Sequence, residues 1–114
     1  MKLTLKLRYR TAFGQSLLVT GNCPQFGDGD TARAVPLVYL NEEFWQVTLS
    51  FPRPTAPKTG IRYNYILRQS DGTVITDWGN DHVLVPELFN EESVLVVDSW
   101  NAAASPEKIG RAHV

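Results

Sequence analysis

Trp78 is the side chain whose type and surroundings point most directly to binding chemistry. It stands among polar residues and a glycine, in the stretch DWGND at positions 77–81, where no apolar pattern requires a large ring. A planar aromatic side chain in a polar loop can offer its face to a ligand. The ring could instead fold back over the end of the domain, and we favour the ligand platform.

A predicted β-hairpin over residues 61–76 must position Trp78. Asp71-Gly72 is a strong turn signal, because tight hairpin turns need positive φ. The following residues, 73–76, are β-branched throughout, as expected of a returning strand. The alternation of residues 61–68 gives one face made of Ile61, Tyr63, Tyr65 and Leu67, and a second made of Arg62, Asn64, Ile66 and Arg68.

The composition of the chain limits its possible functions. A length of 114 residues with 43% hydrophobic content predicts one domain with one core. The net charge of −1 gives no general attraction to nucleic acid or to anionic membranes, so neither is expected as a partner. Cys23 is the single cysteine, which excludes an internal disulfide and favours a reducing compartment. The start, MKLTLKLRYR, alternates and is neither a signal peptide nor a membrane span. These features predict a cytoplasmic protein.

Short strands at regular spacing predict an all-β protein. Residues 2–10 alternate, with leucines and Tyr9 facing inward and a solvated basic row facing out. Further strands are expected at 16–20, 35–39, 44–51, 83–86 and 94–97, with Pro36 at a sheet edge and Trp45 in the core. Residues 22–32 and 52–60 are expected to be loops, and 87–92 a turn. About seven or eight such strands predict an antiparallel, immunoglobulin-like β-sandwich.

The predicted module covers residues 1–100. Residues 101–114, NAAASPEKIGRAHV, differ in composition and are expected to be a linker or an added tail. Asp28-Gly29-Asp30 lacks the distal glutamate and the spacing of a calcium loop, so no metal site and no cofactor are predicted. His82 and His113 have no nucleophile motif to pair with, and the sequence predicts no catalysis by this module.

Five segments in order resemble the family 20 carbohydrate-binding module, the starch-binding domain. The similarity covers about residues 1–100 and implies an antiparallel β-sandwich that binds starch, glycogen or maltooligosaccharide. The matching segments are TAFGQSLLVTGN, QFGDGD, FWQVTLSFP, IRYNYILRQSDGTVITDWGND and VVDSW.

The resemblance implies two sugar sites, to which the sequence matches unevenly. In the first site, Trp78 matches the second of two stacking tryptophans. Gly29, Asn64 and Gly79 stand where the family has the other tryptophan, a supporting lysine and an acidic residue. The second site matches Phe13-Gly14 with Gln15, and Tyr39 is the nearest candidate for its tyrosine.

A glucose ring stacks its apolar face on an aromatic plane, while its hydroxyls need flanking donors and acceptors. The candidate glucan-binding residues are Trp78, Asn64, Asp77, Asn80, Asp81, Phe13, Gln15 and Tyr39.

The resemblance also implies a parent protein. A module that begins at Met1 and runs into a linker-like tail is similar to the N-terminal module of family 77 4-α-glucanotransferases, which are amylomaltase-like enzymes. A C-terminal catalytic domain would then be its partner within the chain. Two alternatives stay open. The first is a degenerate module that only packs against a catalytic domain or a second copy, and the second is a protein-binding immunoglobulin-like domain.

Overall fold

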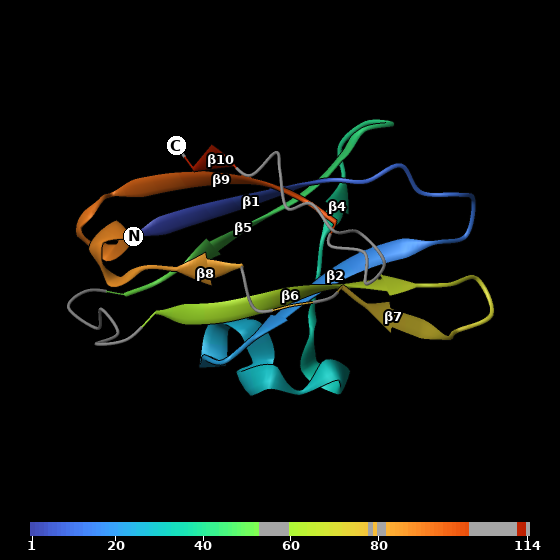
Figure 1. Ribbon diagram of the computed structural model, residues 1–114, viewed down its shortest axis with the longest axis horizontal. Coiled ribbons are helices and arrows are strands. Elements are labelled where there is room, and N and C mark those ends of the chain that lie inside the picture. The colour runs from blue at the N-terminus through green and yellow to red at the C-terminus, as the bar shows by residue number, and fades with distance from the viewer. Residues whose placement is uncertain (53–59, 78, 80–81, 101–111, 114) are drawn as a thin grey trace.

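Two β-sheets face each other in the computed structural model of the chain, which describes residues 1–52, 60–77, 79, 82–100 and 112–113 (Figure 1). The first sheet has the strand order β10-β9-β1-β5-β4, and the second has the order β3-β2-β6-β7 with β8 paired to β6. The strands are β1 (Lys2–Arg8), β2 (Ser16–Gly21), β3 (Val35–Pro36), β4 (Val38–Tyr39), β5 (Phe44–Ser50), β6 (Ile61–Arg68), β7 (Val74–Thr76), β8 (Val83–Leu84), β9 (Ser93–Ser99) and β10 (Ala112–His113).

The predicted all-β sandwich is confirmed, with two refinements. The described residues form ten strands, but β3, β4, β8 and β10 have only two residues each, which makes the count exceed the prediction. The pairing is antiparallel except between β1 and β9, which run parallel from Lys2↔Ser93 to Arg8↔Ser99. In the described part of the chain, no helix is long and apolar enough to span a membrane.

The core follows the predicted alternation. Leu3, Leu5 and Leu7 of β1 are fully buried, and Trp45 of β5 is 9% exposed. Each fully buried large apolar side chain contributes about 1.5–3 kcal/mol, so these strands supply much of the driving force for packing the sheets. Ile66 differs from the prediction, since it lies on the outer face of β6 but is 2% exposed. Within the sheet it is paired with Leu18 of β2 on one side and Thr76 of β7 on the other.

The predicted strand at 35–39 is divided between the two sheets. Its first half, β3, pairs with β2, and its second half, β4, pairs with β5. Leu37 lies between them, is 5% exposed, and donates its backbone N–H to the carbonyl of Leu17 over 2.9 Å. This segment therefore carries the chain across the sandwich at a buried residue. Pro36 lies on an edge strand, as predicted.

The prediction of a plain loop at 22–32 is wrong. Two 3₁₀ helices, η1 (Pro24–Gly29) and η2 (Thr31–Arg33), lie together beside the second sheet (Figure 1). Phe26 is fully buried and stacks on Tyr63 at a centroid distance of 5.8 Å. Gly27 has φ +76°, and a Cβ there would lie 2.4 Å from the carbonyl oxygen of Arg33. Phe26 anchors the segment to the core. This could not be predicted from the sequence, because the residues around Phe26 are mostly turn formers.

The predicted turn at 87–92 is also partly helical. A third 3₁₀ helix, η3, covers Pro86–Asn90 and buries Phe89. Phe89 packs edge-on against Phe51 with ring centroids 5.3 Å apart. The connections that contain Phe26 and Phe89 are thus each held against the core by one buried aromatic side chain.

Candidate functional site

Phe13 projects from an ordered turn between β1 and β2. The turn is closed by two hydrogen bonds between Ala12 and Gln15. The Gln15 N–H donates to the Ala12 carbonyl over 3.1 Å, and the Ala12 N–H donates to the Gln15 side-chain oxygen over 2.7 Å. Gly14 takes φ +86°, a value that favours glycine. The Phe13 side chain is 99% exposed. An apolar ring is therefore held in solvent by a well-defined backbone.

The β1–β2 turn packs against the turn between β6 and β7. The Gln15 side-chain amide donates to the Gln69 side-chain oxygen over 2.7 Å. The backbones approach so closely that a Cβ on Gly14 would lie 2.8 Å from the Cβ of Ser70. The predicted hairpin turn is confirmed, with Gly72 at φ +90°. Gln15 thus holds the backbone of the turn that carries Phe13.

Tyr39 lies at the same end of the molecule. It is 53% exposed and contacts Trp45 edge-on at a centroid distance of 5.5 Å. With Arg10, Thr11 and Glu42 it lines a hollow of about 300 Å³. Thr11 lies two positions before Phe13 in the chain, but Phe13 and Gln15 are not among the residues that line this hollow.

The first predicted site is only partly described, since Trp78, Asn80 and Asp81 lie outside the described residues. Asn64 donates its side-chain amide to the carbonyl of Gly79 over 3.0 Å and to Asp77 Oδ1 over 3.3 Å. The side chain of Asp77 is inaccessible to solvent. We therefore revise its predicted role from ligand contact to support of the backbone on either side of position 78.

A buried ionic cluster next to this segment was missed by the sequence analysis. The His82 side chain lies between Asp77 and Asp98, and all three are inaccessible to solvent. The Nε2 atom lies 2.7 Å from Asp77 Oδ2, and Nδ1 lies 3.6 Å from Asp98 Oδ1. Burial alone would lower the pKa of His82, but the hydrogen bond to Asp77 and the pairing with Asp98 outweigh it and raise the pKa to about 9. Without solvent access, the cluster cannot act on a substrate.

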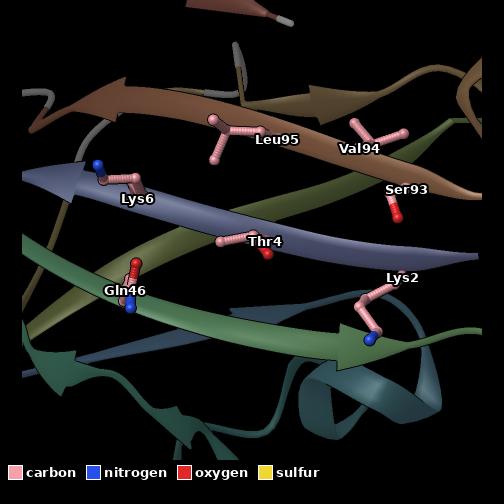
Figure 2. Close-up of a pocket in the computed structure, with 7 residues that line it drawn as sticks. All are labelled: Lys2, Thr4, Lys6, Gln46, Ser93, Val94 and Leu95. Atoms are coloured by element: carbon pink, nitrogen blue, oxygen red, sulfur yellow. The ribbon is translucent and has the colours of Figure 1, made fainter.

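A second hollow, of about 540 Å³, lies on the outer face of the first sheet (Figure 2). Among the described residues, no aromatic side chain and none of the predicted site residues lines it. The basic row of β1 contributes Lys2, which is exposed, and Lys6, which is partly buried and has its Nζ 4.6 Å from the centre of the Phe44 ring. The described lining of this hollow therefore offers no aromatic plane on which a sugar ring could stack. Its lining residues are Lys2, Thr4, Lys6, Gln46, Ser93, Val94 and Leu95.

The described part of the chain thus exposes the aromatic rings of Phe13, on a turn, and Tyr39, on β4, while its cluster of His82, Asp77 and Asp98 is buried. Residues 1–94 match the family model of the starch-binding domain, and the chain belongs to that family of non-catalytic modules.

Solved structures show the same fold. The glycoside hydrolase family 15 glucoamylase from Hypocrea jecorina matches with a TM-score of 0.70 and 24% identity, covering 89% of this chain and 17% of that chain. The γ-CGTase from alkalophilic Bacillus clarkii matches with a TM-score of 0.66 and 20% identity, covering 88% and 15%. The chain thus spans less than a fifth of these two proteins. The family 20 module of the maltotetraose-forming amylase from Pseudomonas saccharophila STB07 matches with a TM-score of 0.56 and 19% identity, covering 70% and 84%.

Proposed function

We propose that this chain binds α-1,4-glucan through exposed aromatic side chains at the turn ends of the sandwich. The observation that carries the proposal is Phe13, a ring that is 99% exposed on a turn held by hydrogen bonds. A glucose face stacked on this apolar ring would remove the ring from water. The turn is already ordered, so its backbone would lose little entropy on binding. Tyr39 would contribute a second aromatic surface, and Arg10 and Glu42 beside it would supply polar partners for hydroxyls.

The second part of this proposal concerns Trp78. The backbone on both sides of this residue is held by Asn64, whose amide bonds Gly79 and Asp77. Such support suits a stacking platform, because a preorganised loop loses less entropy when a ligand binds. With isolated rings instead of a stacking pair, we expect weak binding, from roughly millimolar to tens of micromolar, or about −4 to −6 kcal/mol.

Titration calorimetry or NMR with maltoheptaose tests the proposal. Phe13→Ala and Trp78→Ala should each weaken binding, and the double variant should abolish it. Val85→Ala is the matched control, since it removes a 44%-exposed apolar side chain outside both predicted sites. If neither aromatic variant changes the affinity of the wild type, the assigned platforms are wrong.

A second candidate function is a module that packs against its neighbour in the parent protein. The observation in its favour is that Asn64 and Asp77 bond within the domain, while Val74 and Ile75 are about half exposed on β7, which is an edge strand among the described residues. This function predicts no glucan affinity. It also predicts that Val74→Lys weakens association of the chain with the separately expressed remainder of its protein, an effect that a glucan-binding module would not show.

We further propose that the parent is a cytoplasmic 4-α-glucanotransferase of the amylomaltase type. The resemblance to the modules of such enzymes supports this, and the similar glucoamylase and CGTase chains carry the fold as a small part of a longer protein. With maltotriose, a transferase would release glucose together with longer maltooligosaccharides. Release of glucose without longer products would contradict the transferase assignment and indicate hydrolysis.

A further inference from the structure

Gln69 extends the pairing of β2 with β6 beyond their last backbone pair. The ladder between the two strands ends at Ser16↔Arg68. Gln15 directly precedes β2 and Gln69 directly follows β6, and their side chains are joined by a hydrogen bond of 2.7 Å between residues 54 positions apart. The β1–β2 turn and the β6–β7 turn lie at the same end of the sandwich (Figure 1). One side-chain contact therefore links two turns that are distant in the sequence.

The backbone N–H of Ala12 determines which atoms meet in this contact. A backbone N–H can only donate, so the Gln15 side chain must present its oxygen to Ala12, over 2.7 Å. The Gln15 side-chain NH2 group then points at Gln69, which must present its own oxygen. Turning the Gln15 amide over would set two donors against each other at Ala12. Gln69 therefore serves Gln15 as a hydrogen-bond acceptor.

The hairpin between β6 and β7 holds the backbone of Gln69. The Gln69 N–H donates to the Thr73 carbonyl over 2.7 Å, and the Gln69 carbonyl accepts the Gly72 N–H over 3.0 Å. Within the turn, Asp71 Oδ1 accepts both the N–H and the hydroxyl of Thr73, over 2.9 Å and 2.6 Å. The acceptor that meets Gln15 is thus carried by a backbone with its own set of hydrogen bonds.

The turn that carries Phe13 depends on Gln15. Both hydrogen bonds that close this turn join Gln15 to Ala12, one through the Gln15 backbone N–H and one through its side-chain oxygen. The Phe13 side chain is 99% exposed, so packing against the domain does not hold it. The place of the ring in the free domain therefore follows from the backbone of the turn, and this backbone follows from the orientation of the Gln15 side chain.

We propose that Gln69 is a positioning residue for the Phe13 platform, because it accepts a hydrogen bond from Gln15 and thereby holds the turn. The part of this inference that concerns the ligand rests on the proposed function. The part that concerns the turn does not. Gln69 acts through Gln15 and touches no sugar itself. A turn that is held before binding loses less conformational entropy when a glucose ring stacks on Phe13.

Hydrogen exchange and ¹⁵N relaxation of the 114-residue chain test the hold on the turn without a ligand. Gln69→Leu removes the acceptor, so the Ala12 N–H should exchange about twofold to tenfold faster and the Phe13 amide should become more mobile, as expected for the loss of one neutral hydrogen bond. Gln69→Glu keeps an acceptor oxygen and should restore both values. The β2 amides report whether the sheet is intact in each variant.

The matched control is Gln46→Leu, the same substitution on β5 and outside both predicted sites, which should change neither value. If the Ala12 and Phe13 amides behave alike in the wild type and in Gln69→Leu, the proposal is overturned.

Maltoheptaose affinity of the same four proteins, followed at the Phe13 amide, tests the effect on binding. Gln69→Leu should bind about twofold to fivefold more weakly than the wild type, since the freed turn must be ordered again on binding. Gln69→Glu and Gln46→Leu should bind like the wild type. A more mobile turn in Gln69→Leu with unchanged affinity would refute the positioning role. Absence of binding by the wild type would refute the proposed function, and exchange of the Ala12 N–H would still decide whether Gln69 holds the turn.

Discussion

The stability of this domain should fall between pH 6.5 and pH 9 because of one histidine. The pKa of His82 is raised from 6.5 to about 9 in the folded state, where hydrogen bonding and charge pairing with two carboxylates outweigh the cost of burial. A raised folded-state pKa means that the folded protein binds a proton more tightly than the unfolded chain does. The resulting stabilisation is fully present below pH 6.5 and is lost as the pH rises to about 9.

The size of the effect follows from the shift. One pKa unit corresponds to 1.36 kcal/mol, so a shift of about 2.5 units makes the free energy of unfolding decrease by about 3 kcal/mol across this interval. Domains of this size are stabilised by about 5–15 kcal/mol in total, so the change is large enough to measure. The pKa of Asp98 is lowered, because its hydrogen bonds from His82 and the tyrosines outweigh burial. The stabilisation from Asp98 is lost only in acid, outside the measured range.

Urea unfolding followed by tryptophan fluorescence, at half-unit steps from pH 6 to pH 9.5, measures this dependence. The wild type should lose stability steadily through the interval, and His82→Gln should be less stable at pH 6.5 and lack the decline. Arg8→Gln should follow the wild type, since an exposed ion pair contributes only about 0–1 kcal/mol. A wild-type free energy of unfolding that stays constant from pH 6.5 to pH 9 would refute the assignment of a charged His82.

Two further predictions concern residues with opposite environments. Phe26→Ala should cost about 3–5 kcal/mol because the ring is fully buried, while Phe13→Ala should change stability by less than about 0.5 kcal/mol, as thermal unfolding can show. Gly27→Ala should destabilise the domain more than Gly72→Ala. Both glycines have positive φ, but a new Cβ would meet the carbonyl of Arg33 at position 27 and open space at position 72. Equal costs of the two alanine variants in urea unfolding would contradict the packing at Gly27.

Local pattern predicted the main strands and their inner faces. Period-2 alternation is a property of each strand alone, so the burial of Leu3, Leu5, Leu7 and Trp45 follows from the sequence. The turn at Gly72 follows as well, because its φ is a local requirement. These features need no knowledge of which strands become neighbours.

Features that depend on how the sheets meet could not be predicted. The parallel pairing of β1 with β9 leaves no local sign, because either direction buries the same side chains. The crossing at Leu37 could not be predicted either, because one short apolar stretch supplies a strand to each of the two sheets. The family resemblance predicted the exposed ring of Phe13 as a site residue, whereas alternation alone says nothing about a turn.

The ionic cluster shows the same limit for the site. Alternation placed Tyr63 and Tyr65 in the core but could not show that both hydroxyls meet Asp98, which lies more than 30 positions away. The burial of His82 could not be predicted, because Asp98 belongs to β9 of the first sheet and Asp77 directly follows β7 of the second. Asp77 is a predicted ligand contact because it flanks Trp78 in the sequence, whereas its inward orientation follows from contacts with Tyr65 and His82.

An NMR titration of the 114-residue chain with maltoheptaose tests the central claim of glucan binding most directly. We expect saturable shifts, in the millimolar to tens-of-micromolar range, centred on Phe13 and Tyr39 and on the Trp78 indole. Shifts at only one of these places would assign binding to that site alone. No shift at millimolar maltoheptaose would contradict glucan binding and leave packing against the rest of the parent protein as the function of this domain.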